Sequence, residues 1–156
     1  MIKITRVDER LVHGQVAFAW TNSLGADCIL IVNDDAAADK IRAATLKLAA
    51  PAGIKFSIKS VEDAIVLLNG DKTGKYKIFV IVGNTDDALK LAENVKEVDH
   101  INLGNMKKTE GRRAITNSLA IDDHDAENIR VMVQAGVVVE CRAVPTDKEI
   151  DAMSLI

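Results

Sequence analysis

The sequence predicts an α/β fold in which a mainly parallel sheet is covered by helices on both faces. Short runs rich in β-branched residues alternate with longer amphipathic stretches along the whole chain. Parallel strands need long crossover connections, usually helices, and the right-handed crossover rule then gives a doubly wound sandwich. No linker, repeat or low-complexity tract interrupts the alternation, so we expect residues 1–156 to form a single domain.

The predicted strands are short apolar runs bounded by polar or turn-forming residues, as expected for strands buried in a parallel sheet. In chain order they are Ile2–Val7, Cys28–Asn33, Lys55–Ser60, Lys77–Val82, Asp99–Leu103, Ser118–Ile121 and Val137–Ala143.

The stretches between these runs carry helical periodicity or helix-start signals. We predict helices at Gly14–Ser23, Ala36–Leu48, Val61–Leu68, Thr85–Val95, Asp122–Gln134 and Thr146–Met153. Asn33-Asp34-Asp35 is typical of a helix N-cap with an acidic first turn, and Pro51 and Gly53 follow the end of that helix.

Composition excludes several classes of function. The net charge is −3 and aromatic residues make up 3% of the chain, which argues against nucleic-acid binding and against stacking platforms for bases or sugars. The N-terminal segment MIKITRVDER has no signal-peptide character, and apolar runs such as Ile78–Val82 and Val137–Val139 are too short to span a bilayer. Cys28 and Cys141 lie inside apolar runs and are predicted to be reduced core residues, which favours a cytoplasmic protein.

No segment predicts a cofactor or a metal. A dinucleotide fingerprint does not follow the first strand, and Lys72-Thr73-Gly74 lacks the surroundings of a P-loop. Asp122-Asp123-His124-Asp125 does not have the spacing of a known metal loop, and acidic residues at a helix start have a sufficient electrostatic reason. His100, which precedes a buried strand, is interpreted as structural.

The loop after the first strand, Asp8 to Gln15, contains the residues best suited to chemistry. It places His13 and Gly14 beside a helix N-terminus, where backbone N–H groups favour an anion. Arg10 offers a planar pair of donors for phosphate oxygens. Asp8 can accept a hydrogen bond from a ring nitrogen or hold Arg10 in place. These parts predict a nucleophilic histidine for phosphoryl transfer.

Two stretches resemble a known family. The run Arg6 to Val16, RVDERLVHGQV, followed by Trp20, resembles the signature of the enzyme IIB component of the bacterial sugar phosphotransferase system, mannose/fructose/sorbose class. The stretch Ile101 to Met106, followed by Gly111-Arg112 and the later run LAIDD, is similar to the family's second motif. Asn105 departs from that motif, because a second glycine is usual there.

The resemblance implies a function and partners for the chain. His13 is then the phosphorylated nucleophile, at Nδ1, with Arg10 as phosphate partner and Asp8 as orienting group. The donor is a phosphohistidine on a cytoplasmic IIA component. The acceptor is a sugar (mannose, fructose, sorbose or an N-acetylated hexosamine) held by the membrane components IIC and IID, with which the chain associates peripherally.

The resemblance also implies a seven-stranded sheet in the order 4-3-2-1-5-6-7, in which strands 1 and 5 are neighbours. Loop 104–113 then flanks loop 8–14, at the carboxyl ends of the strands, where ligands bind in such sheets. We therefore expect Gly14, Gln15, Lys107 and Arg112 to contact phosphate or partner. Lys108 and Arg113 belong to the same basic cluster, for which a merely solvated loop is the alternative.

Two other functions fit the same residues. One is a binding module that holds a nucleotide or a phosphorylated metabolite at the first strand–helix turn, and the other is a phosphorylated regulatory protein without a transport role. Acid-labile phosphate on His13 would support the transferase, whereas tight nucleotide binding without labelling would support the module.

Overall fold

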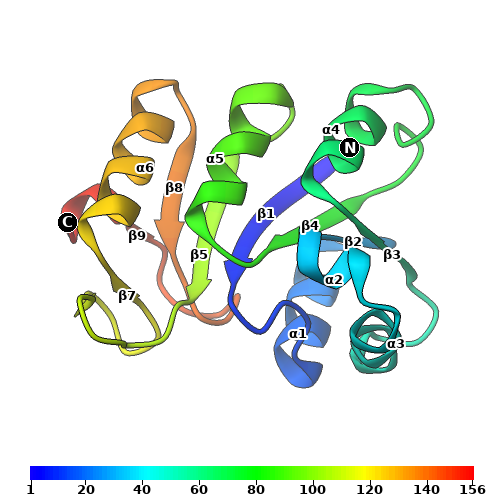
Figure 1. Cartoon of the computed structure of the whole chain (residues 1–156), viewed down its shortest axis with the longest axis horizontal. Helices are drawn as coiled ribbons and strands as arrows, with labels where there is room; N and C mark the ends of the chain where they lie inside the picture. Colours follow the sequence, from blue (N-terminus) through cyan, green and yellow to red (C-terminus); the bar gives the residue numbers. More distant parts are fainter.

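The computed structural model describes residues 1–156 as one sheet between two layers of helices (Figure 1). In chain order the elements are β1 Ile2–Asp8, α1 Gly14–Leu24, β2 Cys28–Val32, α2 Asp34–Ala38, α3 Lys40–Ala49, β3 Lys55–Lys59, α4 Val61–Asn69, β4 Ile78–Val82, α5 Thr85–Asn94, β5 His100–Asn105, β6 Arg113–Ala114, β7 Ala120–Ile121, α6 Asp123–Gln134, β8 Val138–Cys141, β9 Ile150–Asp151 and the 3-10 turn η1 Ala152–Ser154.

The main sheet has seven strands in the order β3-β2-β4-β1-β5-β8-β9. All neighbours are parallel except β8 and β9, which pair antiparallel. The predicted α/β class with a mainly parallel seven-stranded sheet is confirmed, as is the adjacency of the first and fifth strands.

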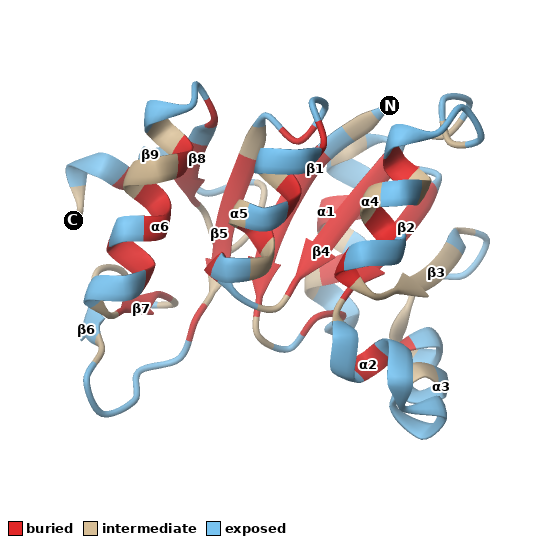
Figure 2. Cartoon of the chain, turned by 45° about the horizontal axis from the view of Figure 1, so that its top comes forward, coloured by how far each residue is buried: buried red, intermediate tan, exposed pale blue.

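Two apolar cores lie on opposite faces of this sheet. The larger contains 26 buried residues and joins the sheet to α4, α5 and α6, and the smaller contains 12 and joins it to α1, α2 and α3. Figure 2 shows the buried central strands between helices whose outer sides are exposed. None of the helices combines the length and the apolar character that crossing a bilayer requires.

The position of the fourth strand corrects the expected order. β4 lies between β2 and β1, and not at the edge of the sheet. Ile78–Val82 is buried along its whole length, which only an interior strand allows. β3 forms the edge instead, and its lysines are typical of edge strands.

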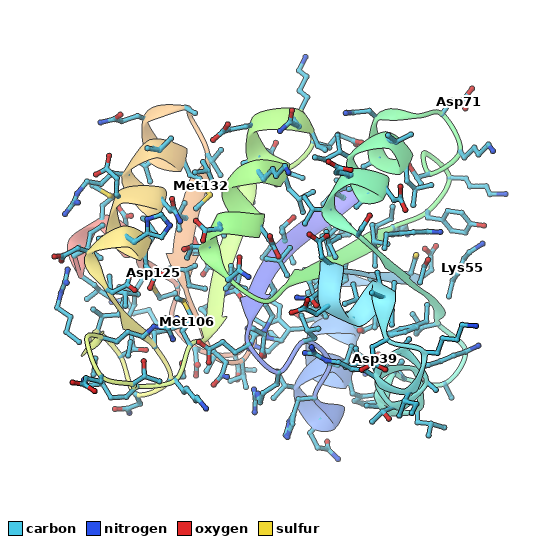
Figure 3. All side chains as sticks on the ribbon, viewed as in Figure 1. Asp39, Lys55, Asp71, Met106, Asp125 and Met132 are labelled. Carbon is cyan, nitrogen blue, oxygen red and sulfur yellow. The ribbon has the colours of Figure 1, made fainter.

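The predicted helix Ala36–Leu48 is two helices, α2 and α3. Asp39, labelled in Figure 3, has extended backbone angles between them. Its carboxylate accepts hydrogen bonds from the backbone N–H groups of Ile41 and Arg42, 3.0 and 3.1 Å away. An aspartate that caps a new helix in this way ends the preceding one.

Two predictions in the C-terminal part of the chain need correction. The short strand predicted at Ser118–Ile121 is present as Ala120–Ile121, but it pairs with β6 in a separate two-stranded sheet and not in the main sheet. Leu119 still forms a parallel bridge with Met106, just after β5, and packs in the larger core. The predicted helix Thr146–Met153 is not an α-helix, since it begins with a turn and contains the short strand β9. Ile150–Asp151 instead pairs with β8, covering an edge that would otherwise stay open, and only η1 remains helical.

Candidate functional site

The loops after β1 and β5 lie side by side, as predicted. β1 pairs with β5 up to Asp8, whose register partner is Asn105. The backbone N–H of Glu9 then donates to the carbonyl oxygen of Asn105 at 3.0 Å. The loop that carries His13 is therefore joined by hydrogen bonding to the start of the basic loop.

Asp8 is a buried carboxylate shared by two arginines. It is 1% exposed and accepts from Arg10 through the backbone N–H (3.0 Å), Nε (3.2 Å) and Nη2 (3.3 Å). Arg6 donates to the same carboxylate through Nη2 at 3.2 Å. The sequence left open whether Asp8 would hold Arg10 or the His13 ring, and in the structure it holds Arg10. The remaining nitrogen of Arg10, Nη1, makes no hydrogen bond in the structure.

Between Arg10 and His13 the loop turns inward and then outward. Leu11 has φ +60°, in the left-handed region that a branched residue rarely adopts, and both Leu11 and Val12 are buried in the smaller core. Such a conformation persists only when the surrounding packing stabilises it. The two buried side chains thus anchor the loop between its exposed residues Arg10 and His13.

His13 is the N-cap residue of α1 and its side chain is exposed. Its carbonyl oxygen accepts the first helical hydrogen bonds, from Val16 and Ala17 at 3.0 Å each, while its ring makes no hydrogen bond or ion pair. Gly14 and Gln15, both exposed, form the first turn of the helix, and a Cβ at residue 14 would meet nothing within 4 Å. The ring therefore has open space around it, next to N–H groups that have no helical partner.

Arg6 lies beneath this loop and is the main site residue that the sequence did not reveal. It is 2% exposed, and Nη1 donates to Asn102 Oδ1 (2.7 Å) and to the Arg142 carbonyl oxygen (3.1 Å). Burial lowers the pKa of the guanidinium, and the charge of Asp8 acts in the opposite direction. Gly104 leaves the space for it, since a Cβ at that residue would lie 2.0 Å from Arg6 Cζ.

Trp20 ties α1 to the same network. Its ring lies 5.2 Å from Arg6 Cζ and 4.9 Å from Arg142 Cζ, and its Nε1 donates to the Ala143 carbonyl oxygen at 3.2 Å. Cation–π contacts of this kind are strongest when they are shielded from water, as here where Trp20 is 1% exposed. The helix that begins at His13 is thereby fixed to β1 and to the end of β8.

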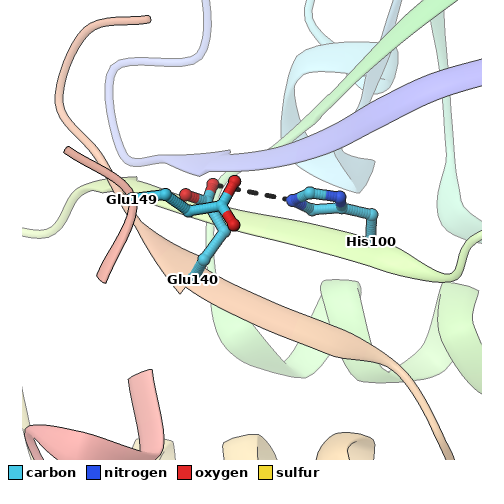
Figure 4. A group of neighbouring side chains, drawn as sticks. All are labelled: His100, Glu140 and Glu149. Carbon is cyan, nitrogen blue, oxygen red and sulfur yellow. Dashed lines mark ion pairs between the residues drawn. The ribbon is translucent and has the colours of Figure 1, made fainter. Parts of the chain in front are cut away.

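The network continues across β5 and β8, where it forms a group that resembles a metal site. His100, Glu140 and Glu149 have potential ligand atoms within 4.8 Å of one another (Figure 4). Arg142, however, binds both carboxylates, with Nε 2.7 Å from Glu140 and Nη2 3.3 Å from Glu149. Asn102 Nδ2 also donates to Glu140 at 2.6 Å. These contacts account for both carboxylates as members of an ion-pair network.

The charge state of Glu140 follows from these partners. Burial raises the pKa of a carboxyl group, but the His100 ring, whose Nε2 lies 3.8 Å away, and the hydrogen bonds from Arg142 and Asn102 outweigh this effect and lower the pKa of Glu140. Glu140 is thus a buried anion whose charge is balanced by Arg142.

The basic loop is partly neutralised. Arg112 Nη1 lies 2.5 Å from Glu9 Oε1, and Glu9 Oε2 accepts from the Lys107 backbone N–H at 3.1 Å. The hydrogen bond to Glu9 raises the pKa of Arg112. Arg113 pairs with Asp123 at 3.3 Å.

Two lysines complete this loop. Lys108 Nζ donates to backbone carbonyl oxygens of its own loop, at Thr109 and Arg112. The exposed ammonium group of Lys107 makes no hydrogen bond or ion pair in the structure. Among the predicted phosphate and partner contacts in this loop, Lys107 is therefore uncommitted, whereas Arg112 is already paired.

Both thiols lie in the core, as predicted for reduced cysteines. Burial raises the pKa of Cys141 to about 12, so this thiol is protonated at neutral pH. His124, in the acidic run of α6, pairs with Asp86 at 2.6 Å, and the Asp122 and Asp125 carboxylates form the capping box of that helix.

The chain is similar to known proteins over its whole length. Residues 2–156 match the family described as the PTS system sorbose subfamily IIB component. The chain is 34% identical to the sorbose-specific EIIB component of Lacticaseibacillus casei over 156 residues, which covers all of this chain and 95% of that one. It is 31% identical to the mannose-specific EIIAB component of Escherichia coli (strain K12), of whose length it spans 48%.

The fold agrees with a solved structure as well. The crystal structure of the IIBSor domain of the sorbose permease from Klebsiella pneumoniae superposes with a TM-score of 0.93 at 28% identity, covering 99% of this chain and 94% of that one. Sequence and fold match over nearly the whole length, and the chain therefore belongs to the sorbose subfamily of PTS IIB components, the phosphotransferases of sugar uptake.

Proposed function

We propose that His13 is the residue that carries the phosphoryl group. It accepts the group from a phosphohistidine on a IIA component and donates it to a sugar presented by the membrane components IIC and IID. The observation that carries the proposal is the exposed, unbonded ring of His13 at the N-terminus of α1, in the same loop as the anchored Arg10. A IIA donor fits the name of the EIIAB relative, which joins components A and B.

The chemistry needs a neutral imidazole. In the first transfer the lone pair of Nδ1 attacks phosphorus, the N–P bond of the donor breaks, and the donor nitrogen keeps the electron pair. In the second transfer a sugar hydroxyl attacks, the N–P bond to His13 breaks, and the hydroxyl proton can move to the released imidazole. Atoms and charge balance in both steps without a metal or a cofactor.

Arg10 is proposed to bind the phosphoryl oxygens. Asp8 holds its guanidinium through Nε and Nη2, which leaves Nη1 for a ligand. A side chain that is already oriented loses less entropy when it binds an oxyanion in the transition state. Gly14 and Gln15 would add the N–H groups of the first turn of α1.

The basic loop is proposed to face the partner. Lys107 and Lys108 supply exposed positive charge, which favours approach of a phosphorylated donor. Arg112 acts indirectly in this proposal, because its ion pair with Glu9 keeps the two loops together. The sugar is proposed to be a hexose or an N-acetylated hexosamine, since relatives are named for sorbose, mannose and N-acetylgalactosamine.

Phosphate labelling tests the proposal, and the three histidines of the chain provide matched variants. The protein is incubated with the general phosphoenolpyruvate-dependent phosphorelay and a IIA component, and acid-labile, alkali-stable phosphate is measured. His13→Gln should accept no phosphate, whereas His124→Gln should be labelled at the wild-type rate. Wild-type labelling of His13→Gln would overturn the assignment of His13.

A further inference from the structure

A cleft of about 610 Å³ lies at the β3 edge of the sheet. The strands β2 and β4 separate this edge from β1, which leads into the His13 loop. The floor of the cleft is made by apolar residues of β2, β4 and α4, and one wall by β3. The loop 71–76 closes the other side. Figure 3 shows Lys55 and Asp71, which both line it, at the outer edge of the molecule. A volume of this size suits a small-molecule ligand.

The two faces of β3 differ in character. Phe56 and Ile58 pack against the smaller core, while Lys55, Ser57 and Lys59 line the cleft. Lysines on an edge strand can serve simply to prevent association with another strand. That role requires only exposed ammonium groups, however, and does not explain why further lysines from another segment converge on the same space.

The cleft is strongly cationic although the chain is acidic overall. Four lysines line it, against a single carboxylate, that of Asp71, while the whole chain carries a net charge of −3. The lysines are Lys55, Lys59, Lys72 and Lys75. Positive charge gathered in a concave site raises the local concentration of anions.

Tyr76 fixes part of this charge in place. Lys55 Nζ donates to the Tyr76 hydroxyl at 3.0 Å and lies 4.7 Å from the ring centroid, and Lys75 Nζ lies 5.2 Å from the same centroid. The hydrogen bond to Lys55 lowers the pKa of the Tyr76 hydroxyl. At the floor, burial raises the pKa of the Cys28 thiol, so this group is neutral and does not repel an anion.

We propose that this cleft binds a phosphorylated small organic molecule, with its phosphates on the lysines and its apolar or planar body on the floor formed by Cys28, Leu30, Leu67 and Ile78. Lysine is a common phosphate ligand and acts as a point charge. The apolar floor distinguishes this site from a surface that attracts any polyanion. The proposal does not depend on His13, and it fails or stands separately from the phosphoryl-transfer function.

The test uses ATP as the probe, because it joins several phosphates to a planar body. The ¹⁵N-labelled protein is titrated with ATP, and separately with inorganic tripolyphosphate, while backbone amide shifts are followed. The expected result is a saturable shift confined to β3 and loop 71–76, with tighter binding of ATP than of tripolyphosphate. Saturable shifts at loop 8–14 instead, no saturation up to about 10 mM ATP, or equal affinity for tripolyphosphate would overturn the proposal.

Matched charge reversals separate the cleft from general attraction. The double variant Lys72→Glu/Lys75→Glu changes two exposed residues of the cleft loop and should weaken ATP binding about tenfold or more. The control Lys90→Glu/Lys96→Glu makes the same change in net charge at exposed positions outside the cleft and should leave the affinity within about twofold. An equal loss in both variants would overturn the proposal, and phosphate acceptance at His13 should be unchanged in both.

Discussion

The substitution Gly104→Ala tests the buried arginine network with a single added carbon. A Cβ at residue 104 would lie 2.0 Å from Arg6 Cζ and 2.2 and 2.4 Å from its two terminal nitrogens, whereas real Cβ contacts under 3.0 Å essentially never occur. The guanidinium must therefore move by about 1 Å or more, because close-packed interiors cannot absorb such an overlap.

That movement disturbs three hydrogen bonds at once. They join Arg6 to Asn102 Oδ1 (2.7 Å), the Arg142 carbonyl oxygen (3.1 Å) and Asp8 Oδ2 (3.2 Å). Breaking a buried ion pair costs about 3–5 kcal/mol, because a charge is left without its partner. Because Arg6 keeps some of these bonds after it moves, we expect a loss of about 3 kcal/mol in the free energy of unfolding, at the lower end of this range. For a chain of this length such a loss lowers Tm by roughly 6–12 °C.

Denaturant unfolding followed by Trp20 fluorescence measures this loss. The control is Gly74→Ala, at an exposed glycine where a Cβ meets nothing within 4 Å, and its stability should stay within about 1 kcal/mol of the wild type. If Gly104→Ala unfolds within about 0.5 kcal/mol of the wild type, Gly104 is not required by Arg6 and the reasoning is refuted.

The other predictions concern the site and one surface pair. Arg10→Lys should slow both phosphoryl transfers, because lysine keeps the charge but cannot bind Asp8 and phosphate together; equal rates in both half-reactions would remove Arg10 from the site. Lys107→Glu/Lys108→Glu should slow phosphoryl transfer from a IIA component and flatten the salt dependence of its rate, whereas the control Lys90→Glu/Lys96→Glu should change neither. Wild-type rates of Lys107→Glu/Lys108→Glu at low salt would contradict this prediction. The hydrogen bond to Asp86 raises the pKa of His124 in the folded protein. The stabilisation from this pair is therefore fully present below about pH 6.5, the pKa of an unfolded histidine, and is lost as pH rises through the pKa of His124 in the folded state. His124→Gln should abolish that dependence, and identical Tm–pH curves for the two proteins would refute it.

The fold was largely predictable from local sequence patterns. The errors of the prediction lie mainly where pairing between distant segments determines the structure. The strongly apolar run Ile78–Val82 identifies a strand, but only the assembled sheet determines which strands lie beside it. Ile150–Asp151 is extended because β8 offers it an antiparallel partner. The break at Asp39 is different, since an aspartate two residues before Ile41 is a local cap signal that an uninterrupted helical pattern concealed.

The grouping of the candidate site residues was predictable where they are close in the chain. Asp8, Arg10 and His13 occupy one loop, and the adjacency of the first and fifth strands placed the basic loop beside it. Arg6 and Gly104 were missed because their contact joins segments 98 positions apart, and an arginine within a strand gives no sign of its partner. The pairing of Arg112 with Glu9 was hidden for the same reason.

These contacts combine a rigid buried support with an exposed histidine ring. In the proposed function His13 must meet two different partners in turn, so its ring has to remain accessible and unbonded, as it is at the start of α1. An exposed ring is positioned only by its backbone, and that backbone is fixed by the buried Leu11 and Val12 and by Trp20 farther along the helix. The charges that would serve phosphate are oriented from below, by Asp8, before either partner arrives. Preorganised charge lowers the barrier of phosphoryl transfer without requiring the histidine itself to be buried.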